Sequence, residues 1–175
     1  MKASGTLIRR TPLTDTSLIV HWCTREEGII KTVAKGARRP TSPFAGKLDL
    51  FYFCEVEIHP ARNGDLHTLK DLILERPRLG LRRSYLQTLM ASYFVRLIDL
   101  VAEPSTPVPD LADLLERGLD YLEAGAADRR AMRHFEKQLA EMLGLDGEGI
   151  EPFAAIGEAC GRLPEQRGEL VERLG

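Results

Sequence analysis

The side chains in this sequence that point to a chemistry are its clustered cations. The stretch KTVAKGARRPTSPFAG, residues 31–46, holds four lysines and arginines among glycines and prolines. Such a cluster attracts phosphate groups through charge and counterion release, and it needs no base-specific geometry. The alternative is a solvated basic surface with no ligand. The candidate residues for binding a polyanion are Arg9, Arg10, Lys31, Lys35, Arg38, Arg39 and Lys47.

Catalytic chemistry finds little support in the sequence. One face of a predicted strand carries Glu55, Glu57 and His59, which occupy alternate positions. This pattern is more typical of a solvent-exposed surface than of a metal site. His134 stands on a charged helical segment, where exposure to solvent is the simplest interpretation. The sequence contains no GxxxxGK[ST], GxSxG or HExxH motif. We therefore expect a protein that is not an enzyme and that binds no metal or cofactor.

The cations lie on segments with the period of β-strands. Residues 36–46 contain glycines and prolines that exclude a long regular element, so they predict a loop. Lys31 and Lys35 share one face of the segment before this loop. If the first and third strands are close together, the cations form one continuous patch. The five segments that predict a small β-barrel are 6–13, 17–24, 28–36, 48–60 and 66–74.

Aromatic side chains would strengthen a nucleic-acid interface, because bases stack on them. Trp22 alternates with Leu18 and Val20, which predicts a core position rather than a stacking platform. Phe44 lies in the basic loop and is the one candidate for base stacking. Anchoring the loop to the barrel is the alternative role for Phe44, and we favour it.

The second half of the chain has the period of α-helices. Apolar residues at spacings of three and four predict a helix over 85–101. Asp110 is a candidate N-cap for a second helix over 111–125, and a third begins near Asp128. Two short helical pieces follow. The fold class is therefore α+β, with a small five-stranded barrel in a domain over 1–76 and an α-helical domain over 77–175.

Charge and cysteine content narrow the setting of the protein. Residues 1–83 hold 15 Lys and Arg against 9 Asp and Glu, whereas residues 84–175 hold 9 against 17. A polyanion is therefore expected on the first half, and the acidic second half is free to engage proteins. Three scattered cysteines argue against disulfides and against a zinc module, and the N-terminus lacks an apolar signal segment. We expect a cytoplasmic protein with no membrane contact.

Several stretches resemble one known family. The N-terminal LIRRTPLTDTSLIVHWCTREEGIIKTVAKGARRPTS, the strand segments GKLDLFYFCEVEI and LHTLKDLIL, and the helical LQTLMASYFVRLIDLV and RHFEKQLAEMLGL are similar to the RecO family of DNA repair proteins. The resemblance runs from about residue 7 to residue 145. It implies a five-stranded barrel of the oligonucleotide-binding (OB) type followed by an α-helical domain, in a nucleoid-associated protein that acts as a recombination mediator. Such a protein binds single- and double-stranded DNA, anneals complementary strands, and with RecR helps RecA displace single-strand binding protein (SSB).

The resemblance also implies partners and a site. The partners are single- and double-stranded DNA, RecR and the SSB tail, with RecA engaged indirectly, and the cations named above correspond to the family's basic barrel surface. Many members carry a four-cysteine zinc module after the third long helix, but only Cys160 falls in that region here, so no zinc is expected. Two other functions stay open from the residues alone, an RNA-binding barrel and a non-catalytic protein-interaction adaptor.

Overall fold

A computed structural model describes residues 1–103, 106–125 and 127–175 of the chain. The chain divides into two compact units, each with its own internal contacts. The first comprises Met1–Arg78 and Ala102–Ala112, and the second comprises Leu79–Val101 and Asp113–Gly175. The expected domain boundary after residue 76 stays a prediction.

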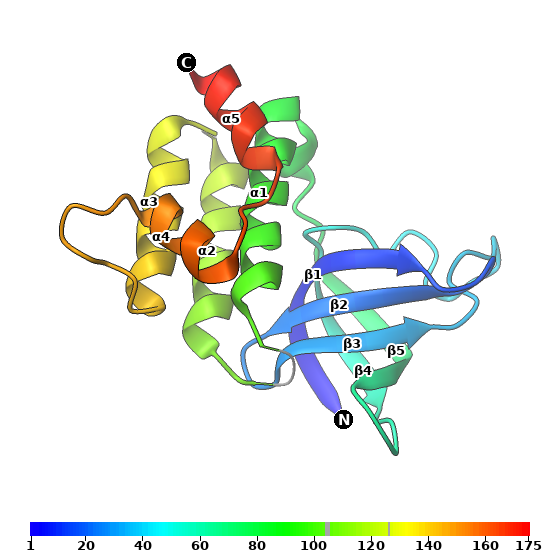
Figure 1. The fold of residues 1–175 in the computed structure, drawn as a ribbon. Helices are drawn as coiled ribbons and strands as arrows, with labels where there is room; N and C mark the ends of the chain where they lie inside the picture. The colour runs from blue at the N-terminus through cyan, green and yellow to red at the C-terminus, as the bar shows by residue number, and fades with distance from the viewer. Residues whose placement is uncertain (104–105, 126) are drawn as a thin grey trace. The chain divides into compact units, whose positions relative to one another are not determined.

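The first unit is a closed barrel of five strands, in which the strand order is β1-β2-β3-β5-β4 (Figure 1). Neighbouring strands are antiparallel except β3 and β5, which pair in parallel. This is a barrel of the OB type, and five helices follow it in the chain, so the predicted α+β class is confirmed. The strands are β1 Lys2–Pro12, β2 Leu18–Thr24, β3 Gly28–Ala34, β4 Phe53–His59 and β5 Leu66–Arg76.

The barrel interior is filled by the apolar faces of its strands. Trp22 and Val20 are fully buried, as their alternation predicted, and the Trp22 indole N–H donates to the Thr32 hydroxyl oxygen at 2.9 Å. The fourth strand is shorter than predicted, because the chain before Phe53 turns rather than extends. Leu48 belongs to the barrel core, so these turns close part of the interior.

The connection from β3 to β4 is a series of turns, as its glycines and prolines predicted. Phe44 anchors it: the side chain is 6% exposed and belongs to the barrel core. Near its end Phe51 adopts a positive φ of 72° with its side chain buried, which is uncommon for a non-glycine residue. The Phe51 N–H donates to the Leu7 carbonyl at 2.9 Å, and its own carbonyl accepts from the buried Arg78 at 3.0 Å. The loop is therefore held at several points along its length.

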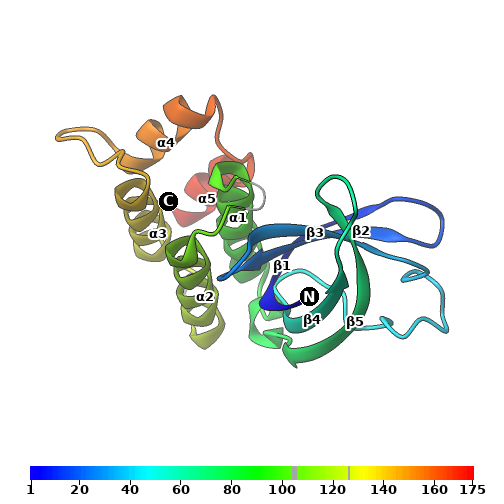
Figure 2. The same ribbon diagram turned by 90° about the horizontal axis from the view of Figure 1, so that it is seen from below.

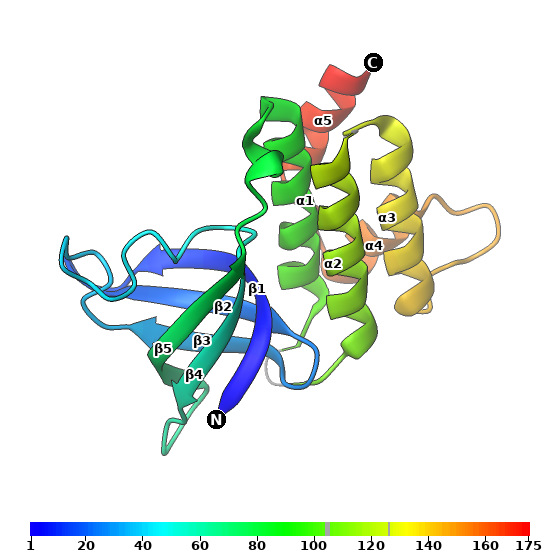
Figure 3. The ribbon, with the colours of Figure 1, turned by 180° about the vertical axis from the view of Figure 1, so that it is seen from behind.

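Most of the second unit consists of helices (Figure 3). The first helix has the predicted bounds, and Asp128 caps the third, where its carboxylate accepts from the Ala131 N–H at 2.7 Å. Asp110 lies inside the first turn of the second helix, so its expected role as N-cap was wrong. No helix among residues 1–103, 106–125 and 127–175 has the length and apolar character to cross a membrane. The helices are α1 Tyr85–Val101, α2 Pro109–Ala124, α3 Arg129–Met142, α4 Pro152–Cys160 and α5 Gln166–Leu174, after the short η1 Leu79–Arg82.

A buried polar cluster joins three helices of this unit. Glu136 on α3 is only 2% exposed, and one of its carboxylate oxygens accepts from the Tyr93 hydroxyl of α1 and from the Arg167 guanidinium of α5, each at 2.8 Å. The Arg167 guanidinium also lies over the Phe153 ring of α4, 3.6 Å from its centroid. Burial, with Glu136 adding to it, raises the pKa of Tyr93, so Tyr93 stays a hydrogen-bond donor.

Candidate nucleic-acid interface

The basic loop is fastened to the turn between β1 and β2. The Arg38 N–H donates to the Thr16 carbonyl at 2.9 Å, and the Gly36 N–H donates to the Ser17 hydroxyl oxygen at 3.2 Å. The Arg38 guanidinium reaches the Thr14 carbonyl at 3.4 Å. Figure 2 shows the blue β1–β2 turn and the cyan β3–β4 loop at the same end of the barrel. Two segments distant in sequence thus form one surface.

Three of the predicted cations gather on this surface. Lys35, Arg38 and Arg39 are all exposed, and Arg39 folds back so that its Cδ lies 3.6 Å from the position a Cβ would take on Gly36. In the part of the chain that the structure describes, none of the three forms an ion pair. Their charges are therefore not cancelled by neighbouring carboxylates, and this is the arrangement that attracts phosphate. We call Lys35, Arg38 and Arg39 the basic tip.

Two other predicted cations are tethered to carboxylates. Arg10 lies 3.0 Å from an Asp49 oxygen and donates to the Leu48 carbonyl at 2.7 Å, so it holds the end of the loop against β1. The Lys31 ammonium lies 2.7 Å from Asp65, and this contact lowers the pKa of the Asp65 carboxyl. Both charges are partly neutralised within the barrel, so they add less to the attraction of phosphate than the basic tip does.

The remaining two predicted cations are placed differently. Arg9 is exposed on β1, and in the strand register it pairs with His21, which in turn pairs with Lys31. Strand β2 therefore lies between β1 and β3, so Arg9 and Lys31 are separated by His21 and do not lie on adjacent strands. Lys47 is half-buried in the loop. That all seven cations contact phosphate stays a prediction.

Neither Trp22 nor Phe44 provides a base-stacking platform on this surface. Trp22 lies in the core, and Phe44 anchors the loop from inside the barrel, so neither ring faces a ligand. The acidic strand face is a wet surface, as expected: Glu55 pairs with Lys2 at 3.6 Å and Glu57 with Lys70 at 2.8 Å. No group of three or more possible metal ligands occurs among the described residues.

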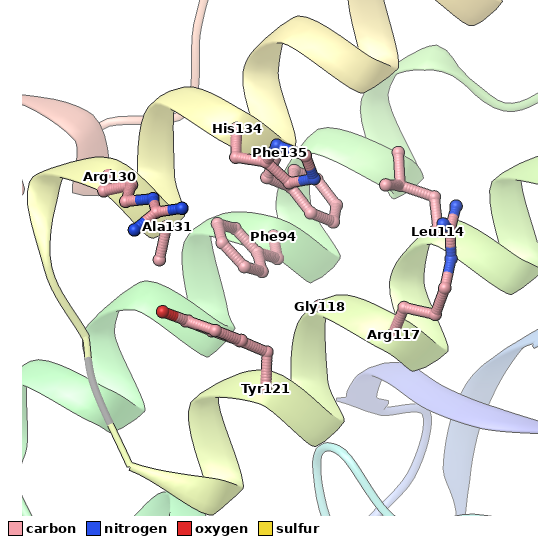
Figure 4. Close-up of a pocket in the computed structure, with 9 residues that line it drawn as sticks. All are labelled: Phe94, Leu114, Arg117, Gly118, Tyr121, Arg130, Ala131, His134 and Phe135. Carbon is pink, nitrogen blue, oxygen red and sulfur yellow. The ribbon is translucent and has the colours of Figure 1, made fainter.

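The helical unit contains a pocket that sequence reasoning missed (Figure 4). It has a volume of about 460 Å³ and lies between α1, α2 and α3. The Phe94 and Phe135 rings stack in its floor, with centroids 3.9 Å apart and planes within 6°. Gly118 lets α2 approach these rings closely, because a Cβ there would lie only 3.0 Å from the Phe135 ring. The rim is polar and carries two cations, Arg117 and Arg130, together with Tyr121 and His134.

A closed OB-type barrel with a cationic loop, continued in the same chain by a set of helices, defines an OB-fold protein with an appended helical unit. The family model described as Recombination protein O N terminal matches residues 1–78, which is the barrel.

Relatives extend the likeness beyond the barrel. A protein from Rhodopirellula baltica is 30% identical over 161 residues, 91% of this chain and 57% of its own. A Cyanothece protein is 36% identical over 125 residues, 70% of this chain and 41% of its own, and one from Pelobacter propionicus is 30% identical over 157 residues, 90% and 61%. All three are named DNA repair protein RecO. The barrel of this chain therefore matches the N-terminal region of the RecO family, and its likeness to RecO proteins continues into the helical unit. The chain spans about half the length of these relatives.

Proposed function

We propose that the chain is a DNA-binding recombination mediator that acts without catalysis in DNA repair. The observation that carries this proposal is the basic tip on the loop end of an OB-type barrel, three exposed cations that form no ion pair with the residues the structure describes. Such a surface holds the phosphates of either single- or double-stranded DNA. Because it binds backbone rather than bases, it accepts complementary strands alike and screens their repulsion, which favours annealing. Nucleoid association follows from binding to DNA.

The pocket of the helical unit supplies the contact with a protein partner. Its floor accepts an apolar side chain, and Arg117 and Arg130 on its rim complement carboxylates. An acidic peptide that carries an apolar residue fits this combination, and we assign the pocket to the SSB tail. With DNA on the barrel and the tail on the helices, the chain would act where SSB coats a strand. RecR and, through it, RecA complete the expected set of partners.

The test is fluorescence anisotropy of a labelled single-stranded oligonucleotide over a series of salt concentrations. The variant is Lys35→Glu/Arg38→Glu/Arg39→Glu. The control Arg83→Glu/Arg96→Glu/Arg162→Glu makes the same change in net charge at exposed positions of the helical unit. Loss of three phosphate contacts should lower the log–log salt slope by about 2, since each contact on a single strand contributes about 0.7.

The outcomes separate the candidate functions. A basic-tip variant that binds like the control would remove DNA from the barrel and leave an adaptor that works through proteins. Competition with a matched RNA oligonucleotide tests the choice of nucleic acid, because phosphate contacts alone serve either sugar. Circular dichroism of both variants shows whether the barrel is intact.

A further inference from the structure

The outer face of α3 carries a row of cations that neither the barrel nor the pocket accounts for. The row consists of four cations, Arg129, Arg130, Arg133 and Lys137, with His134 among them, at positions that fall on one side of a helix. All five are exposed and together line a shallow hollow on the surface of the helical unit. The opposite side of α3 packs inward through residues such as Met132, Phe135 and Leu139. We call the five residues the α3 stripe.

Little in the described part of the chain neutralises this stripe. Arg129 donates to the carbonyl of Gly175, and Lys137 lies 3.7 Å from Glu141 in an exposed pair. Arg130 and Arg133 have no ion pair among the described residues. Arg129 and Arg133, and then Arg133 and Lys137, are like charges four residues apart, a spacing that destabilises a helix. An anion laid along the stripe would relieve this repulsion.

The α3 stripe is basic, whereas the second half of the chain as a whole is acidic. Residues 84–175 hold 17 acidic against 9 basic side chains, and four of those nine basic residues are on this helix face. An ordinary solvated helix mixes both signs on its outer face. An exposed Glu141 lies at one end of the row and the N-cap Asp128 at the other, while the buried Glu136 points into the core. The concentration of one sign on one face is typical of a binding surface for a polyanion.

We infer that the α3 stripe is a second phosphate-binding surface, which holds a nucleic-acid strand independently of the barrel. This inference rests on the proposed function and deepens it, because a protein that anneals two strands gains from two separate backbone-binding surfaces. A linear row of cations along a helix suits a backbone with regularly spaced phosphates better than a compact anion. The shared residues Arg130 and His134 also line the peptide pocket, whereas Arg133 and Lys137 belong to the stripe alone.

The test uses the full chain and the variant Arg133→Glu/Lys137→Glu, which leaves the pocket residues in place. The matched control is Arg96→Glu/Arg162→Glu, with the same change in net charge at exposed positions of the same unit. The probe is a labelled single strand of about 30 nucleotides, longer than the roughly 4–16 that one OB fold covers. We expect about tenfold weaker binding at low salt and a salt slope lower by about 1.4. Annealing of complementary strands should slow in parallel.

A variant with neutral substitutions controls for the effect of charge reversal on folding. Arg133→Gln/Lys137→Gln removes the same contacts without introducing repulsion, so it should lower the salt slope equally and the affinity less. An α3 variant that binds the strand like its control overturns the inference. So does a variant that keeps strand binding but loses an acidic glutamate-rich peptide, since the stripe would then serve a protein.

Failure of this inference and failure of the proposed function are distinguishable. If the basic-tip variant loses binding while the α3 variant matches its control, the stripe is overturned and the barrel stands. If the α3 variant loses binding while the basic-tip variant matches its control, the stripe stands and the barrel assignment falls. If both variants lose strand binding while both control variants bind like the unmodified chain, the result supports two phosphate-binding surfaces.

Discussion

The buried cluster in the helical unit permits a quantitative prediction. Replacing Arg167 with methionine keeps most of the side-chain volume. Among the described residues, it leaves the Glu136 carboxylate, 2% exposed, with the Tyr93 hydroxyl as its remaining donor. Removing one partner of a buried ion pair typically costs about 3–5 kcal/mol. Because the Arg167 side chain is itself 18% exposed and water reaches it, we expect the low end, about 3 kcal/mol.

Urea denaturation followed by far-ultraviolet circular dichroism measures this cost. With an m value of about 2 kcal/mol/M, a loss of 3 kcal/mol moves the midpoint of helix unfolding down by about 1.5 M. Trp22, the only tryptophan of the chain, lies in the barrel core and reports on the barrel separately. As a control, Arg173→Met removes an exposed ion pair with Glu169 and should leave the midpoint almost unchanged.

A second substitution tests the cause. Glu136→Gln in the Arg167→Met background removes the uncompensated charge, and the neutral amide oxygen still accepts from Tyr93. The double variant should therefore recover at least about 1 kcal/mol of the free energy of unfolding. A single variant that costs less than about 1 kcal/mol, or a double variant no more stable than the single, would show that the cluster does not hold the helices as we argue.

Two further predictions concern other parts of the chain. Arg117→Glu at the rim of the pocket should weaken binding of a labelled SSB-tail peptide by about five- to tenfold, measured by anisotropy, and unchanged binding would remove the tail from this pocket. Among the thiols, burial raises the pKa of Cys54 to about 12, and Cys23 is also buried, whereas Cys160 is half-buried. At pH 8 only about one Cys54 in ten thousand is thiolate. In the folded protein one thiol, that of Cys160, should therefore react readily with a thiol reagent, and none should do so in the Cys160→Ser variant. Two rapidly reacting thiols in the folded protein would contradict the buried placement of Cys23 and Cys54.

Much of the fold was predictable because local patterns and tertiary packing agree. The alternation around Trp22 and the apolar spacing of α1 are strong periodic signals, and the structure places both as predicted. The short β4 was missed because LDLFYF reads as an extended apolar run, while the chain uses Leu48 and Phe51 to close the barrel from turns. Periodicity cannot distinguish a strand from turns that bury the same residues.

The candidate site was predictable only in part. Residue type identified the basic tip, but ion pairs such as Arg10 with Asp49 depend on contacts distant in the sequence. The pocket left one local signal, Gly118 inside a helix, where glycine is unfavourable unless packing requires it. The net acidity of the second half concealed the α3 stripe, because summed charge does not show which side of a helix each residue occupies.

The anchoring of the basic loop has a kinetic consequence. Phe44 fixes the loop from inside the barrel, and backbone hydrogen bonds of Gly36 and Arg38 fix it from the β1–β2 turn. An incoming strand therefore meets cations whose backbone is already ordered, and little conformational entropy remains to be lost on contact. Capture of a strand should then be governed by diffusion and charge rather than by rearrangement of the protein, so it should be fast at low ionic strength and slow steeply as salt is added.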